Sequence, residues 1–202
     1  SRCEKTEKKE LSFTDHNLVK QKEDLEYVYY KCKNCGEEKK EYNDKEYTID
    51  LGDGKTDTII GHYDLDMPKE MLDICNEKRD LFEVNQLTMV NANTKLQKYA
   101  NIRATEIAYY YTTTHYRPNG KYVLDSEDMI GIDAENIAPG PNAQIACKNL
   151  FSSPMHNETI VSNRYRSIAI STFCRKKDDG SYNHLFVQLF STGKADWWNT
   201  NL

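Results

Sequence analysis

Three residues able to bind a metal or transfer a proton lie on separate segments: His115, Glu135 and His156, each about 20 residues from the next. Imidazole nitrogens and a carboxylate oxygen are ligands that suit Zn²⁺, and the same groups serve as general acids and bases. A fold that brought them together would form a small polar cleft. Two interpretations stay open: a divalent metal site with room for water, or a structural cluster in which two His side chains hold a buried Glu.

The segments between these residues have to position them, and three helices are predicted there. The first follows Asp66, with Pro68 in its first turn. The second runs from about Thr94 to Tyr110 and ends in β-branched and aromatic residues just before His115. The third follows residues 139–141 and stops at Pro154. The second carries an apolar stripe typical of a helix packed on a sheet: Leu96, Ala100, Ala104, Ile107 and Ala108.

The strands predict the sheet on which these helices pack. Residues 167–174 and 183–190 contain few charges and flank a turn, so we expect a long antiparallel hairpin at the centre of the sheet. Residues 135–138 form a short strand or extended segment. Helices that precede paired strands in this way are typical of the α+β class.

The first 45 residues have a different character, being rich in Lys and Glu and poor in aliphatic side chains. They contain Cys32-Lys33-Asn34-Cys35-Gly36, a Cys-x2-Cys turn that can aim two sulfurs at one ion. Cys3 and His16 are candidates for the third and fourth ligands of a structural Zn²⁺ in a zinc-ribbon-like module. The alternatives are a disulfide from Cys3 to Cys32 or Cys35, or reduced thiols.

Residues 46–66 predict a β-hairpin around Gly52-Asp53-Gly54, which we interpret as a linker to the larger domain. His62 is expected on the exposed surface of a strand. The tail, residues 192–202, either packs back on the domain or links it to something else. Among the remaining cysteines, Cys147 and Cys174 are a candidate pair, which would leave Cys75 a buried free thiol.

Composition argues against two roles, nucleic-acid binding and membrane spanning. The formal charge is −5, and acidic and basic residues are interleaved along the sequence. The sequence has no basic stripe of the kind that binds nucleic acid. No apolar run approaches the roughly 18 residues needed to span a membrane. The sequence shows no signal peptide and starts at Ser1 without Met, so we expect that one has been removed.

Several motifs in a fixed order give the chain a family resemblance across roughly residues 67–191. It resembles the CAP superfamily (SCP/PR-1-like domains), in particular the bacterial extracellular branch. The motifs are Asn76-Glu77-Lys78-Arg79; Leu96-x3-Ala100-x2-Arg103-x2-Glu106; His115-Tyr116-Arg117-Pro118-Asn119-Gly120; Glu135-Asn136-Ile137-Ala138; Ser153-Pro154-Met155-His156; and Val187-Gln188-Leu189-Phe190.

The resemblance implies an α-β-α sandwich with a central antiparallel sheet, and a surface cleft that in some members binds a divalent metal. His115, Glu135 and His156 match the cleft residues of the family. Two positions depart from its pattern: Met155 replaces the usual Gly, and Leu150 replaces the usual Trp. The second Glu and the other His of plant and animal members have no clear counterpart here.

These features predict a secreted or cell-surface CAP-domain protein that acts as a binding or interaction module through the His/Glu cleft. Its partner would be a small apolar molecule, a peptide or a cell-surface component. Tyr109, Tyr110 and Tyr111 are the nearest aromatic candidates for a contact surface, although packing is the favoured role. The alternative is a metal-dependent, peptidase-like hydrolase using the same cleft, but no His-Glu-x-x-His or Gly-x-Ser-x-Gly motif is present.

Overall fold

The structure is a computed structural model that describes residues 16–200. The chain divides into two units between Asn43 and Asp44, and each unit is described by itself. Cys3, one of the predicted zinc ligands, lies outside the described residues.

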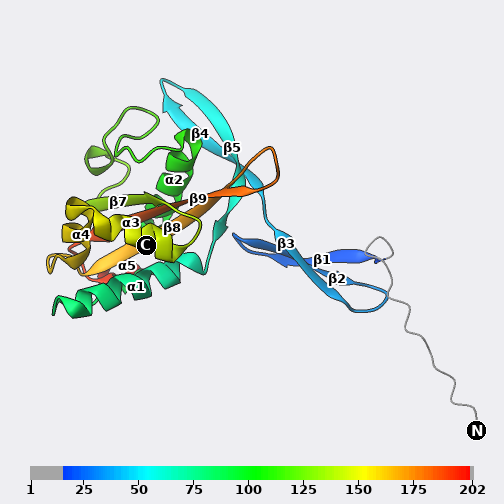
Figure 1. The fold of residues 1–202 in the computed structure, drawn as a ribbon. Helices are drawn as coiled ribbons and strands as arrows, with labels where there is room; N and C mark the ends of the chain where they lie inside the picture. Colours follow the sequence, from blue (N-terminus) through cyan, green and yellow to red (C-terminus); the bar gives the residue numbers. More distant parts are fainter. Residues whose placement is uncertain (1–15, 201–202) are drawn as a thin grey trace, which may run out of the picture. The chain divides into compact units, whose positions relative to one another are not determined.

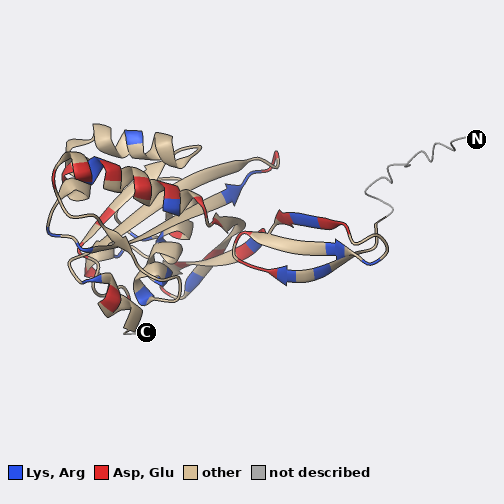
Figure 2. Ribbon diagram, turned by 90° about the horizontal axis from the view of Figure 1, so that it is seen from below, with Lys and Arg blue, Asp and Glu red and all other residues tan. Residues whose placement is uncertain are grey.

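The first unit contains a three-stranded antiparallel sheet, called here the N-terminal sheet, with strands β1 (Leu18–Glu23), β2 (Tyr27–Cys32) and β3 (Glu38–Tyr42) in that order. The carboxylate of Asp24 accepts hydrogen bonds from the backbone N–H groups of Glu26 and Tyr27 and so forms the first turn. In the described part of this unit, the only buried hydrophobic residue is Cys32. Figure 2 shows residues of both signs of charge on this sheet, with Lys and Glu together on β1 and β3.

The second unit is built on a six-stranded sheet (Figure 1). Its strands are β4 (Lys45–Gly52), β5 (Lys55–Asp64), β6 (Thr88–Met89), β7 (Ala134–Pro139), β8 (Ser167–Lys176) and β9 (Tyr182–Ser191). The order is β4-β5-β8-β9-β7, and β6 pairs in parallel with the start of β8. The predicted hairpin of β8 and β9 is confirmed as the centre of this sheet, and β7 forms one edge.

The hairpin of β4 and β5 is not a linker, because β5 pairs antiparallel with β8 and extends the sheet. Its apolar residues explain this: Ile49, Ile59 and Tyr63 are buried in the core that α2 covers. The expectation for His62 was also wrong. Its side chain is buried, and Nδ1 lies 2.8 Å from a carboxylate oxygen of Asp44.

Five helices and a short 3-10 turn complete the described part of this unit. They are α1 (Met67–Leu81), α2 (Lys95–Tyr110), η2 (Val123–Asp125), α3 (Ala143–Ser152), α4 (Pro154–Val161) and α5 (Ala195–Thr200). Helix α2 packs on β8 and β9, whereas α1 and α3 pack on each other and on the opposite face of the sheet together with α4 (Figure 1). The α+β class and the α-β-α sandwich are thus confirmed.

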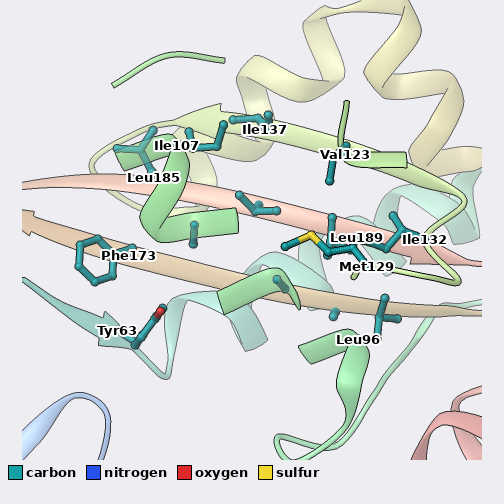
Figure 3. Packing of buried hydrophobic residues seen from close by; sticks show 14 of the residues in the cluster. Tyr63, Leu96, Ile107, Val123, Met129, Ile132, Ile137, Phe173, Leu185 and Leu189 are labelled. Atoms are coloured by element: carbon teal, nitrogen blue, oxygen red, sulfur yellow. The ribbon is translucent and has the colours of Figure 1, made fainter. Parts of the chain in front are cut away.

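The central strands sort their side chains between two apolar cores by simple alternation. On β9, Leu185, Val187 and Leu189 join the core beneath α2, which Figure 3 shows in close view. Phe186 and Phe190, which alternate with them, join the core beneath α1 and α3. Both faces of the strand are buried, which explains why this stretch of sequence is a continuous apolar run rather than an alternating one.

Local signals mark the starts of three helices, α2, α3 and α4. Thr94 caps α2 by accepting a hydrogen bond from the Gln97 N–H, and Asn142 caps α3 in the same way through Ile145. Pro154 does more than end α3: it occupies the first turn of α4, a helix that the sequence did not predict.

Two further expectations are settled by packing. The tail folds back as α5, whose Trp198 is buried in the core beneath α2. The suggested Cys147–Cys174 disulfide is absent, and Cys75 and Cys147 are both free thiols. Cys147 instead lies with Cys75 in the core between α1 and α3.

Candidate functional site

A buried network of charged side chains links α2, the following loop and β7. Arg103 of α2 is fully buried and donates to the Glu135 carboxylate at 2.8 Å and 3.3 Å, and to Glu106 at 2.8 Å. Arg117 donates to the other side of Glu106 at 2.7 Å and to Asp128 at 2.8 Å. We call these five residues the Arg103 network.

The network keeps its charges because each buried ion has an opposite partner. Burial disfavours the charge on Arg103, but the carboxylates of Glu135 and Glu106 outweigh it and raise the pKa of Arg103 above its ordinary value. The pKa of Arg117 is raised in the same way, against burial and mainly through Glu106. The buried carboxylates of Glu106 and Glu135 are therefore both paired with arginine side chains.

His115 meets this network at the surface. Its Nδ1 lies 2.8 Å from Oε2 of Glu135, whose side chain is only 1% exposed, while the His115 side chain is 34% exposed. The loop that carries His115 is fixed on both sides of it: Arg103 donates to the carbonyl of Thr114, and the Val123 N–H donates to that of His115. Glu135 thus binds one imidazole nitrogen and leaves Nε2 for an external partner.

The edge position of β7 explains how residues on both faces of the sheet reach one site. Glu135 lies opposite Leu189 on β9, on the face covered by α2, so it meets Arg103. The next residue, Asn136, points to the other face, where it donates to the backbone carbonyl of His156 at 3.3 Å. His115 and His156 therefore approach the same edge strand from its two sides.

His156 is half-buried at the start of α4. Burial lowers the pKa of His156, and the charge of His115 lowers it further, so the two imidazoles lie within electrostatic range of each other. A lowered pKa favours the neutral imidazole, which is the form that binds metals.

Glu135 fits the role of a supporting residue better than that of a metal ligand. Both of its oxygens accept hydrogen bonds from Arg103, and one of them also contacts His115. A carboxylate that orients a metal-binding His through its other nitrogen is a common outer-shell arrangement. Among residues 16–200, the ligand atoms of His115, Glu135 and His156 do not all lie within 4.8 Å of one another.

Sequence reasoning singled out Arg103 and Glu106 only as parts of a motif and gave neither a role. Arg103 occupies the same apolar stripe as Ala100, Ala104 and Ile107, and all four side chains are buried. A charged residue on an otherwise apolar helix face must have a buried partner, and this was the signal available in the sequence.

The tyrosines after α2 divide between two environments. Tyr109 packs partly against the core and donates its hydroxyl to Asp57, whereas Tyr110 and Tyr111 are about half exposed. Tyr111 has a positive φ of 50° and caps the helix, which turns the chain toward His115.

A second cluster of ligand atoms lies in the N-terminal unit. His16, Cys32 and Cys35 place their ligand atoms within 4.8 Å of one another, and this is the one such group in residues 16–200. Hydrogen bonds from the backbone N–H groups of Cys35 and Asn34 lower the pKa of the Cys32 thiol to about 6. Three of the four predicted zinc ligands are therefore close together in the described part of the chain.

The α-β-α sandwich and the His–Glu pair at the edge of its sheet together define a class of domain. A comparison with protein families identifies that class. Residues 72–190 match CAP, the Cysteine-rich secretory protein family. The match covers more than half of the chain, which therefore belongs to the CAP family, as the motifs indicated. We refer to residues 44–200 from here on as the CAP domain.

Other comparisons add one structure. The chain is similar to an outer surface protein from Borrelia burgdorferi, with 21% sequence identity and a TM-score of 0.49, over 65% of this chain and 97% of that one. No curated protein matches the chain. In the described part of the chain, every helix is too short or too polar to cross a lipid bilayer.

Proposed function

We propose that this protein is an extracellular or cell-surface binding module whose contact site is centred on His115 and His156. The observation that carries the proposal is the position of His115: Glu135 holds one ring nitrogen from below while a third of the side chain faces solvent. An imidazole fixed in orientation and open on one side is suited to holding a ligand atom. The secretory family description supports the location, and the Ser-Pro-x-His run ending at His156 supports the bacterial branch.

The site can accept a divalent metal through two imidazoles. His115 Nε2 and His156 would be the protein ligands, with Glu135 as the carboxylate behind His115. Zn²⁺ bound there would act as a Lewis acid and would leave positions open for a partner's own donor atoms. The residues of this chain orient and shield the site, and a peptide or cell-surface component with a free carboxylate would suit it.

Hydrolysis is the second candidate, and the carboxylates argue against it. A metallohydrolase needs a general base beside the metal-bound water. Glu106 and Glu135 both accept hydrogen bonds from buried arginines, and Asp128 is paired with Arg117. None of these three is free to take a proton from water, which favours binding without turnover.

The experiment compares binding and cleavage in one set of proteins. Zn²⁺ is titrated into the wild-type chain and into His115→Ala, His156→Ala and His184→Gln, the last as a matched control for a half-buried His elsewhere. We expect a zinc-binding step that both alanine variants weaken and His184→Gln keeps. A peptide and ester library is then incubated with the zinc-loaded chain. Zinc-dependent cleavage that His115→Ala abolishes would replace the binding module with the hydrolase.

A further inference from the structure

The turn between β2 and β3 brings two sulfurs to one side of the chain. Gly36 has a φ of 77°, a conformation that glycine adopts easily, and its N–H donates to the carbonyl of Cys32 at 2.9 Å. The Cys32 N–H donates to the carbonyl of Glu37 and closes the turn, and the Asn34 N–H points at the Cys32 sulfur at 3.4 Å. This hydrogen bond helps to fix the position of the Cys32 sulfur on the turn.

His16 is held beside this turn in an orientation that fits a metal ligand. The Lys33 N–H donates to the carbonyl of Asn17 at 2.9 Å and ties the segment before β1 to the turn. Nδ1 of His16 lies 3.2 Å from the Cys35 sulfur, while Nε2 lies 3.3 Å from a carboxylate oxygen of Glu37. A carboxylate on one ring nitrogen directs the other nitrogen toward the metal.

The three ligand atoms lie close enough together to bind one tetrahedral ion after small adjustments. Zn–S bonds of about 2.3 Å and Zn–N bonds of about 2.0–2.1 Å place neighbouring ligand atoms roughly 3.3–3.8 Å apart. The atoms of His16, Cys32 and Cys35 all lie within 4.8 Å of one another, so small rotations would complete the geometry. Thiolate and imidazole ligands select zinc over magnesium or calcium, which prefer oxygen.

The unit that carries this cluster has little else to hold it together. Of its described hydrophobic residues only Cys32 is buried, and that residue is itself one of the candidate ligands. Small polar modules of this kind depend on a metal or a disulfide for their folded state. Cys32 and Cys35 are free thiols, which leaves them available to a metal.

We infer that His16, Cys32 and Cys35 form a structural Zn²⁺ site that stabilises the N-terminal sheet. Three protein ligands account for three of the four tetrahedral positions. This site is separate in residues and in role from the His115 site of the CAP domain. It holds an ion for folding, whereas the other presents an open surface for binding.

Alkylation of the wild-type chain tests the inference without relying on a variant that folds. The whole chain is treated with iodoacetamide with zinc present and after chelation, and each cysteine is followed by peptide mass spectrometry. Zinc should slow alkylation of Cys32 and Cys35 by about tenfold or more, because a metal-bound thiolate is a poor nucleophile. Cys75, Cys147 and Cys174 serve as internal controls, since all three are buried in the CAP domain.

Zinc content provides the second measurement. Cys35→Ser should lose one equivalent of zinc relative to the wild-type chain, whereas His115→Ala, which leaves the cluster intact, should keep that equivalent. The Cys35→Ser protein should keep the cleft properties of the wild type, so failure of one site is distinguishable from failure of the other. Equal alkylation of the exposed Cys35 with and without zinc would overturn the inference. So would a chain lighter by two hydrogens before reduction, with Cys3 linked to Cys32 or Cys35.

Discussion

The N-terminal unit of this chain is much richer in charged residues than the CAP domain, and the two units handle those residues in opposite ways. The N-terminal sheet keeps most of its Lys and Glu side chains at the surface and buries almost nothing apolar. The CAP domain buries two apolar cores and four of the five residues of the Arg103 network, the exception being the exposed Asp128. A domain with a large apolar core can offset the free energy lost when ions are desolvated, provided that each buried ion is paired. A small sheet cannot offset this free-energy cost, and its Cys and His side chains contribute to folding only when they bind an ion.

The largest effect is expected from removing zinc from the whole chain. Structural zinc contributes about 10–16 kcal/mol in small zinc modules, and this energy is folding energy. Chelation at neutral pH should therefore collapse the dispersed amide signals of residues 18–42. Chelation would also empty the proposed cleft site, so the CAP domain is followed in His115→Ala, whose unfolding midpoint by fluorescence of Trp197 and Trp198 should not change on chelation. If the dispersed amide signals of residues 18–42 survived chelation, the N-terminal sheet would not depend on zinc for folding, and the difference drawn between the two units would be wrong.

The next effect is expected from Arg103→Met. The substitution keeps the apolar stem but leaves Glu106 and Glu135 buried with one partner fewer. Breaking a buried ion pair from one side costs about 3–5 kcal/mol. Urea unfolding followed by tryptophan fluorescence measures it, with the exposed Arg164→Met as the control. A loss no greater than that of the control would show that the network contributes nothing to stability.

A smaller effect is expected at the start of α2. Thr94 is buried, and its hydroxyl both caps the helix and donates to the Asn91 carbonyl. Thr94→Ala should lower the free energy of unfolding of the CAP domain by about 1 kcal/mol. Thr113→Ala, exposed beyond the other end of the helix, is the matched control. The amide signals of the N-terminal sheet should not change in either variant.

The smallest effect concerns pH. Burial lowers the pKa of His184 below its ordinary value of 6.5; His62 adds to the shift and Asp64 opposes it. The unfolded chain then binds more protons near that pH, so the free energy of unfolding falls as pH drops through 6.5 toward the lower folded-state pKa. His184→Gln should flatten this slope. Above pH 7 the two curves should run parallel, and parallel curves at every pH would contradict the prediction.

Elements with strong periodicity could be predicted from the sequence. The apolar stripe placed α2 within one residue of its observed start, because this signal is local. The pairing of β5 with β8 and the packing of Trp198 could not be predicted, since each depends on a partner far away in the chain.

The candidate sites divide along the same line. The two cysteines of the N-terminal turn are close because their spacing is short, and a local pattern was enough to pair them. Glu135 was singled out by its residue type and its spacing from His115 and His156, and the family resemblance then matched it to the cleft, but its fixed partner Arg103 was not given a role. The position of Glu135 beside Arg103 follows from the register of β7 on β9 and from the packing of α2. No local sequence motif predicts either of these.

The edge strand β7 places a carboxylate and an amide side by side with partners on opposite faces of the sheet. A slip of one residue would turn Glu135 toward the uncharged core of α1 and α3, and would set Asn136 against the guanidinium of Arg103. Both groups would then be buried without a match. The ion pair thus also opposes strand slippage, and a strand with one neighbour has particular need of such a constraint.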